Sequence, residues 1–330
     1  MSHCRMFVLG LLFVVASTAS ADDRPPLPEM QLTHVSSTID GESQPVRFWA
    51  PTASPDENLP ILVSLHTWSA DGSQDRGDWL RQAVRRKWVY IQPNFRGRND
   101  HPEACGSPLA RQDVLDALDW ALETFPIDRE RIYLAGVSGG GHMTMQMAAY
   151  HPERFSAASA WVGPTDLAEW YRYHAPTGRP GKYAQMIAAC CGGAPGDSTE
   201  IDAQYRARSP VFHLAKAVPL PLDINAGVKD GITGSVPIHH SLRAYNTIAA
   251  ANGDPTISPE TMDELWGQGR LQRPEPSDTQ PDSTYGRDIL LRRTSGQTRV
   301  TIFDGTHEAL PAAACEWLSR YQREVGDSAE

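Results

Sequence analysis

A serine between glycines is the strongest chemical signal in the sequence. Residues 136–140 read Gly-Val-Ser-Gly-Gly, and they join the apolar run Arg131–Gly136 to the helical segment Gly139–Tyr150. A strand that turns at once into a helix, with glycines around a serine, predicts a strained turn that lifts the hydroxyl above a sheet. Ser138 is therefore a candidate nucleophile for acyl transfer. A purely structural glycine-rich turn is the alternative.

A serine hydroxyl needs a base to become nucleophilic, and the base needs an acid to orient it. After a turn of this kind the expected chain order is serine, acid, histidine. We expect His307 to be the base, because it lies between the last predicted strand and the last predicted helix. Asp230, which ends the preceding predicted strand, is the expected acid. Asp166 follows an earlier strand in a similar way and is the alternative acid.

Acyl transfer also requires donors for the developing oxyanion. The first expected donor is the amide of Gly139, directly after the candidate nucleophile. The second should come from the loop that follows the apolar run Pro60–His66, where Thr67 and Trp68 come next. We expect the amide of Trp68 to be this donor and regard the amide of Thr67 as the alternative.

The elements that must position these residues alternate along the chain. Segments Gln31–Ile39 and Pro45–Ala50 flank an Asp-Gly pair and predict a hairpin. The further predicted strands are Pro60–His66, Trp88–Gln92, Arg131–Gly136, Phe155–Val162, Pro221–Val228 and Arg299–Phe303. The predicted helices are Gln74–Lys87, Pro108–Phe125, Gly139–Tyr150, Ser235–Ala251 and Leu310–Val325. This alternation predicts an α/β fold with a mainly parallel sheet flanked by helices.

Two stretches interrupt the alternation, and we expect them to be insertions at the rim of one domain that spans residues 22–330. Residues 163–218 are aromatic and read as irregular. Residues 252–298 are rich in Pro, Gly and Asp, with a short helix expected after Ser258-Pro259 and a hairpin expected through Ser295-Gly296.

Composition and charge exclude several classes of protein. The 330 residues are 40% hydrophobic and 21% charged, which argues against a disordered chain, a collagen or a coiled coil. Thirty Lys and Arg stand against 40 Asp and Glu, a formal net charge of −10. Such a surface repels phosphates, so nucleic acid is not an expected partner.

The first 21 residues read as a secretory signal peptide. Arg5 precedes the apolar run Met6–Ala16, and Ala19-Ser20-Ala21 is an A-x-A cleavage site. The apolar run is much shorter than the roughly 20 residues that span a bilayer. We therefore expect an exported protein, periplasmic or secreted, with no membrane anchor after cleavage. An uncleaved anchor is the alternative.

Four cysteines follow the signal: Cys105, Cys190, Cys191 and Cys315. An even number in an exported protein permits disulfides, and three full pairings are possible. Our hypothesis is a single bridge from Cys105 to Cys190 or Cys191. The spacing matches no zinc pattern, so no metal site is expected.

The glycine turn at Ser138, the Asp230-Gly231 strand end and the late His307 resemble the α/β-hydrolase superfamily. Within it, residues 60–320 look most like catalytic domains of the prolyl oligopeptidase (S9) type and like related secreted carbohydrate esterases. The resemblance implies hydrolysis through an acyl-serine, without metal or organic cofactor. The usual His-Gly turn is replaced here by His66-Thr67-Trp68, and the chain has no room for the N-terminal propeller of S9 oligopeptidases.

The absence of a propeller favours an esterase acting on acylated carbohydrate or aryl esters. A small S9-type peptidase acting on short peptides is the alternative, and an inactive hydrolase-fold binding protein is the alternative from another class. Trp68, Trp161 and the Trp170–Tyr173 cluster could stack on a sugar or aromatic ring, or only pack the core. Arg96 and Arg98 could bind an anionic substrate, although solvated loop charges are the favoured interpretation.

Overall fold

The computed structural model describes residues 25–324, and the predicted signal peptide lies outside this range. Its strands are β1 (Gln31–Ser36), β2 (Ser43–Trp49), β3 (Leu59–Leu65), β4 (Val89–Pro93), β5 (Ile127–Val137), β6 (Ala157–Trp161), β7 (Leu222–Gly227), β8 (Ile289–Ser295) and β9 (Thr298–Phe303). They form one sheet of nine strands in the order β1-β2-β4-β3-β5-β6-β7-β9-β8. The central strands from β4 to β9 pair in parallel, whereas β1, β2 and β8 pair with their neighbours antiparallel.

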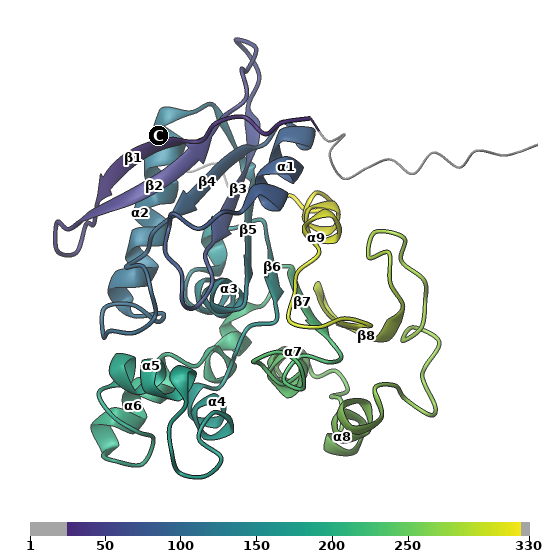
Figure 1. The fold of residues 1–330 in the computed structure, drawn as a ribbon. Helices are drawn as coiled ribbons and strands as arrows, with labels where there is room; N and C mark the ends of the chain where they lie inside the picture. Colours follow the sequence, from purple (N-terminus) through teal and green to yellow (C-terminus); the bar gives the residue numbers. More distant parts are fainter. Residues whose placement is uncertain (1–24, 325–330) are drawn as a thin grey trace, which may run out of the picture.

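The two faces of this sheet are covered by α1 (Gly77–Arg86), α2 (Pro108–Thr124), α3 (Gly139–Tyr150), α7 (His239–Asn252) and α9 (Pro311–Leu318) (Figure 1). Helix α8 (Pro259–Gln268) lies at the periphery. Helices α1 and α9 contact each other, while α2 and α3 form a second group that continues through a short 3₁₀ segment to α7. This is the α/β-hydrolase fold, as the sequence predicted.

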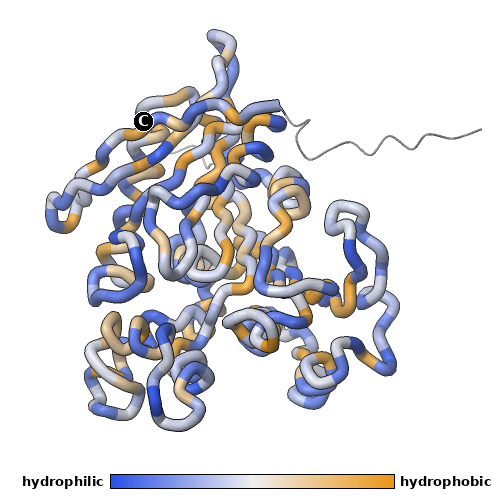
Figure 2. The backbone as a smooth tube through the Cα atoms, in the orientation of Figure 1, coloured by the Kyte–Doolittle hydropathy of each residue, from blue (hydrophilic) through white to orange (hydrophobic). Residues whose placement is uncertain are grey.

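The apolar sequence runs explain why the central strands form. Every residue of β3, β4, β6, β7 and β9 is buried, as expected for parallel strands covered on both faces. Figure 2 shows hydrophobic segments along these strands and polar residues in the peripheral loops. The N-terminal hairpin pairs Ser36 with Ser43 across the predicted turn, and Ser295 pairs with Thr298 in the second predicted hairpin.

Residues 163–218 are helical, which corrects the prediction of an irregular segment. They form α4 (Leu167–Tyr173), α5 (Lys182–Cys191) and α6 (Thr199–Ala207), followed by two short 3₁₀ segments. Asp166 accepts the N–H of Glu169 and so caps α4, and Ser198 caps α6 in the same way. Each helix is only two to three turns long, so its apolar face is too brief to give a clear period in the sequence.

The last predicted helix is also shorter than expected, since α9 ends at Leu318 rather than near residue 325. The helix predicted after Ser258-Pro259 is confirmed as α8, with the Ser258 side chain accepting the N–H of Thr261. Within residues 25–324 there is no helix that combines the length and the apolar character needed to cross a membrane.

Three buried histidines make the stability of this fold depend on pH. Burial lowers the pKa of His66 and of His142 to about 4 and that of His240 to about 3. His240 Nδ1 accepts the N–H of Thr165 at 3.1 Å, which requires an unprotonated nitrogen. In the unfolded chain a histidine has a pKa of about 6.5, so below that pH the unfolded state binds protons that the native state does not. The free energy of unfolding therefore falls as the pH drops from about 6.5 towards the native pKa values.

Lowering the pH from about 7 to about 5 should cost the fold about 2 kcal/mol for each of these histidines. Urea unfolding of the wild type and of His240→Asn at both pH values measures this cost. The asparagine oxygen can accept the Thr165 N–H without titrating, so the variant should lose about 2 kcal/mol less between the two pH values. Equal pH dependence of the two proteins would contradict the assignment of His240.

Candidate active site

Ser138 occupies a strained turn between β5 and α3. Its backbone has φ +58° and ψ −118°, a conformation that a non-glycine residue holds only at a cost of about 1–3 kcal/mol. The turn is fixed on both sides, because the Ser138 N–H donates to Trp161 O at 2.8 Å and Ser138 O accepts the N–H of His142 at 2.9 Å. This is the geometry that the glycine-rich sequence predicted.

Two glycines of the turn are required by close backbone approach. A Cβ at Gly136 would overlap the carbonyl of Gly140, and a Cβ at Gly139 would overlap the backbone N and Cα of Trp68. The first contact lets the chain turn tightly from strand to helix. The second brings the amides of Gly139 and Trp68 to the same place, beside Ser138.

The predicted acid and base are in contact. His307 Nδ1 lies 2.9 Å from both carboxylate oxygens of Asp230, which is fully buried. The carboxylate also accepts the N–H groups of Gly231 at 2.8 Å and of Val236 at 3.1 Å, which hold it in place. Gly234 packs against both side chains, and a Cβ there would overlap Asp230 and His307. Asp166 caps α4 instead, so of the two candidate acids it is Asp230 that contacts His307.

Ser138 and His307 line one cavity of about 680 Å³ at the carboxyl ends of the parallel strands. Ser138 follows β5, Asp230 follows β7 and His307 follows β9, so the sheet brings together residues far apart in sequence. His307 Nε2 has the hydroxyl of Ser235 at 3.5 Å, and the structure describes no direct hydrogen bond from Ser138 to His307. Such contacts are often loose before substrate binds.

The neighbouring loop decides between the two predicted oxyanion donors. The N–H of Thr67 donates to Gln74 Oε1 at 2.9 Å, and Gln74 Nε2 donates in return to Thr67 Oγ1 at 3.1 Å. The Thr67 amide is therefore occupied. Among the described residues the Trp68 N–H has no acceptor, and it faces the N-terminus of α3 beside Gly139. Of the two candidate amides, the one of Trp68 is therefore left free to donate to a substrate.

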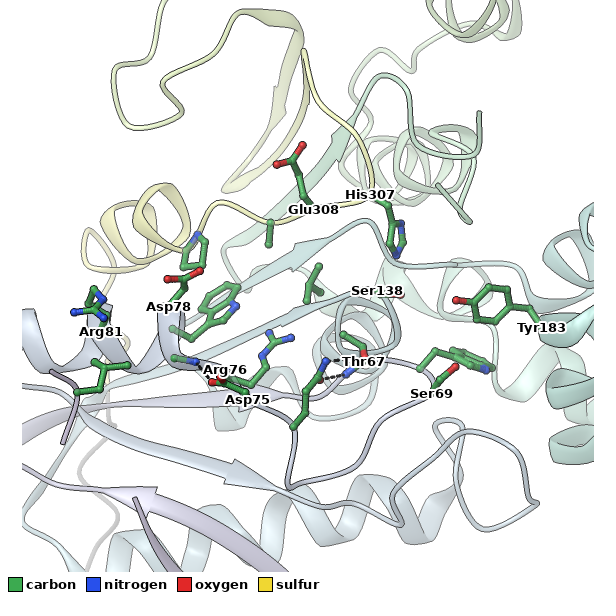
Figure 3. Close-up of a pocket in the computed structure, with 18 residues that line it drawn as sticks. Thr67, Ser69, Asp75, Arg76, Asp78, Arg81, Ser138, Tyr183, His307 and Glu308 are labelled. Carbon is green, nitrogen blue, oxygen red and sulfur yellow. Dashed lines mark hydrogen bonds between the residues drawn. The ribbon is translucent and has the colours of Figure 1, made fainter. Parts of the chain in front are cut away.

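The cavity extends well beyond the predicted residues. Figure 3 shows Ser138 and His307 near its middle, Tyr183 at one end and Arg81 at the other. Side chains that the sequence reasoning missed also line it, namely Ser69, Gln74, Asp75, Arg76, Asp78, Trp79, Tyr183 and Glu308. Most come from residues 74–79, which lead into α1 and form its first turn. No sequence motif marks a site in this segment.

The three tryptophans among the predicted aromatic stacking faces are buried. Trp68, Trp161 and Trp170 expose 1% or less of their surface, so for them the packing interpretation is the correct one. Tyr171 is partly exposed and Tyr173 is 38% exposed, but neither lines the cavity that contains Ser138. Trp68 packs edge-on against Trp170 at 4.7 Å between ring centroids. This contact joins the helices α4–α6 to the loop that contains Thr67 and Trp68. Tyr183 of α5 is an aromatic side chain that does line the cavity.

Arg96 is a structural cation rather than a substrate ligand. Its guanidinium pairs with Asp113 at 2.7 Å and with Asp40 at 2.8 Å, and it exposes only 3% of its side chain. Arg98 is half exposed and pairs with Asp100 at 2.9 Å. Neither residue lines the cavity that contains Ser138.

The hypothesised disulfide is not formed in the structure. Cys105, Cys190, Cys191 and Cys315 are all free and buried. Cys105 and Cys190 are nevertheless neighbours: burial, together with a hydrogen bond to Cys190, raises the pKa of the Cys105 thiol. Within residues 25–324, no group of three or more His, Cys, Asp or Glu side chains is arranged to hold a metal ion.

Comparison with known families agrees with this geometry. The profile of the prolyl oligopeptidase family matches residues 77–258, which is more than half of the chain and includes the turn at Ser138 and the carboxylate Asp230. The chain belongs to the prolyl oligopeptidase family. The match ends before His307, so the base is assigned from the structure and not from the profile.

Relatives of this family member include both peptidases and esterases. An acylamino-acid-releasing enzyme 2 of Oryza sativa subsp. japonica is 27% identical over 165 residues, which cover 47% of this chain and 20% of the rice protein. An acetylxylan esterase of Coprinopsis cinerea is 36% identical over 156 residues, covering 44% of this chain and 42% of the fungal one. The Pyrococcus horikoshii acylaminoacyl peptidase structure has a TM-score of 0.62 at 16% identity, covering 92% of this chain and 43% of its own. The chain thus spans less than half the length of each of these proteins.

Proposed function

We propose that this member of the prolyl oligopeptidase family is an exported serine hydrolase that cleaves carboxylic esters through an acyl-Ser138 intermediate. The observation that carries the proposal is the buried Asp230–His307 pair at the rim of the cavity that Ser138 lines. Three groups of this kind are the minimum that acyl transfer by serine requires.

The geometry supports acylation of Ser138 followed by hydrolysis of the acyl-enzyme. Ser138 Oγ attacks the ester carbonyl while His307 Nε2 takes its proton, and Asp230 stabilises the resulting imidazolium. The N–H groups of Gly139 and Trp68 stabilise the oxyanion, helped by the positive end of α3. The C–O bond then breaks, and His307 returns the proton to the departing alkoxide. Water deprotonated by His307 attacks the acyl-enzyme in the same manner, releasing the carboxylic acid and restoring Ser138.

An ester of a carbohydrate or an aryl alcohol is the substrate class that we favour. The support is the 36% identity to the Coprinopsis cinerea acetylxylan esterase, the highest of the three identities reported above. A peptidase is the second candidate, because the family and the Pyrococcus horikoshii neighbour include acylaminoacyl peptidases. The proposed export rests on the predicted signal peptide.

A substrate panel separates the two candidates. Purified protein is compared on acetylated xylan, feruloyl esters and Ala- or Pro-terminated peptide anilides, with Ser138→Ala as the control for hydrolysis at other sites. We expect kcat/KM to be highest for one of the esters and to be lost in the control. Peptide turnover that exceeds every ester would contradict the esterase assignment and support the peptidase.

A further inference from the structure

A buried arginine borders the cavity close to Ser138. Arg76 directly precedes α1 and exposes only 8% of its surface. The residue lines the same cavity as Ser138 and His307, so the small exposed part of its side chain opens there. In Figure 3 it lies in the cavity wall between the Arg81 end and Ser138.

This guanidinium lacks a counter-ion. Arg76 Nε and Nη2 are shielded from water and have no hydrogen-bond partner among the described residues. The guanidinium carbon lies 5.6 Å from the centre of the neutral Trp79 ring, and the Tyr90 phenol is also close. Asp75 accepts the N–H of Gly77 at 2.8 Å instead and is exposed.

Two arginines of similar burial show the usual arrangement. Arg96, 7% exposed, pairs with Asp40 and Asp113. Arg208, 6% exposed, donates to the carbonyls of Ala104 and Pro102, both at 2.7 Å. Arg76 differs from both of them, because its charge is withdrawn from water and left without an acceptor.

Such an arrangement is costly unless an anion completes it. An arginine stays protonated in proteins, and an uncompensated buried charge costs several kcal/mol. Burial accordingly lowers the pKa of Arg76. A planar guanidinium matches a carboxylate in shape and charge, and such pairs are among the stronger hydrogen bonds of proteins.

We propose that Arg76 forms a carboxylate subsite of the cavity, so that the preferred substrate is an ester that also carries a carboxylate. This inference rests on the proposed esterase function and specifies its substrate. The carboxylate can belong to the acyl group or to the alcohol, and the two sources are distinguished by experiment.

The other charged groups that line the cavity do not prevent a carboxylate from binding at Arg76. Glu308 is held by Arg287, with oxygen–nitrogen distances of 2.7 and 2.8 Å, so its charge is largely compensated. Arg81 donates to the carbonyl of Pro25 at 2.9 Å and adds positive charge at the far end. Asp75 and Asp78 are exposed at the mouth, where water screens their repulsion of an anion.

The test compares esters that differ by one carboxylate. On the acyl side, p-nitrophenyl hemiadipate is compared with p-nitrophenyl hexanoate. On the alcohol side, meta-acetoxybenzoate is compared with meta-acetoxybenzamide. We expect the wild type to prefer the carboxylate by about 10- to 100-fold in kcat/KM in one of the two pairs, the range of a charge-assisted hydrogen bond. The pair that shows the preference identifies which part of the substrate carries the carboxylate.

Variants then connect the preference to Arg76. Arg76→Gln should bring the ratio of kcat/KM close to one, whereas Arg76→Lys should retain part of the preference. Arg85→Gln is the matched control, because the substitution removes the same charge. Arg85 is exposed on α1, the helix that Arg76 precedes, and does not line the cavity. It should leave the ratio unchanged.

Several outcomes would overturn the subsite. Hydrolysis of both neutral esters without preference for either carboxylate ester would refute it while leaving the esterase function intact. A preference that survives unchanged in Arg76→Gln would refute it as well. The kcat/KM ratios of the wild type are measured without any variant, so the absence of a carboxylate preference would refute the subsite even if Arg76→Gln failed to fold. Failure to hydrolyse any of the four esters would contradict the proposed function itself, and the subsite with it.

Discussion

Replacing Ser138 by alanine is expected to lower kcat/KM for p-nitrophenyl acetate by about 10⁴-fold or more, as removal of a serine nucleophile does elsewhere. The variant loses the hydroxyl that we propose forms the acyl bond, while the Asp230–His307 pair and the amides of Gly139 and Trp68 remain. Steady-state kinetics of the purified variant, with circular dichroism to confirm folding, measure the effect.

Ser235 provides the matched control for this prediction. Its hydroxyl lies 3.5 Å from His307 Nε2 and is the competing candidate nucleophile that the structure places beside the base. Because Ser235, unlike Ser138, is not held at a positive φ in a strand-to-helix turn, Ser235→Ala should lose at most about tenfold in kcat/KM. The opposite ranking of the two variants would contradict the assignment of Ser138.

Replacing Asp230 by asparagine is the second change with a large expected effect. The carboxylate accepts the Nδ1 proton of His307, which leaves Nε2 free to take the proton of the nucleophile. The amide would donate to Nδ1 and favour the wrong tautomer, so we expect kcat/KM to fall by about 10⁴-fold. Kinetics at neutral pH measure this loss.

Asp304→Asn is the control for that substitution. Asp304 lies three residues before His307, is half exposed and pairs with Lys229 at 2.9 Å. An exposed pair of this kind contributes about 0–1 kcal/mol to stability, so the variant should keep kcat/KM within about twofold of the wild type. If Asp230→Asn retained a tenth of the wild-type activity or more, Asp230 would not be the orienting acid.

The parts of this site that the sequence predicts are those fixed by local chain geometry. Gly136–Gly140 encodes the turn directly, because glycines permit the close backbone contacts that any Cβ would block. The positions of Asp230 and His307 follow from a general property of parallel sheets, whose strands all end at the same edge. The mostly apolar sequence of the fully buried strand β3 was equally clear.

The parts that could not be predicted depend on tertiary contacts. Nothing in the local sequence distinguishes Arg76, which is buried without a partner, from Arg96, which is buried with two. The choice between the Thr67 and Trp68 amides depends on the Gln74 side chain, which folds back onto the loop. The helices of residues 163–218 pack on one another and on Trp68 and Cys105, so their short sequences look irregular in isolation.

The central claim is that Ser138 is an activated nucleophile, and covalent labelling tests it most directly. The purified protein is treated with a fluorophosphonate, and the modified peptide is identified by mass spectrometry. We expect one adduct per chain, located on Ser138, with labelling that slows markedly in Asp230→Asn and is absent in Ser138→Ala. No adduct on the folded wild type, as an inactive hydrolase-fold binding protein would give, or an adduct on another residue such as Ser235, would contradict the account.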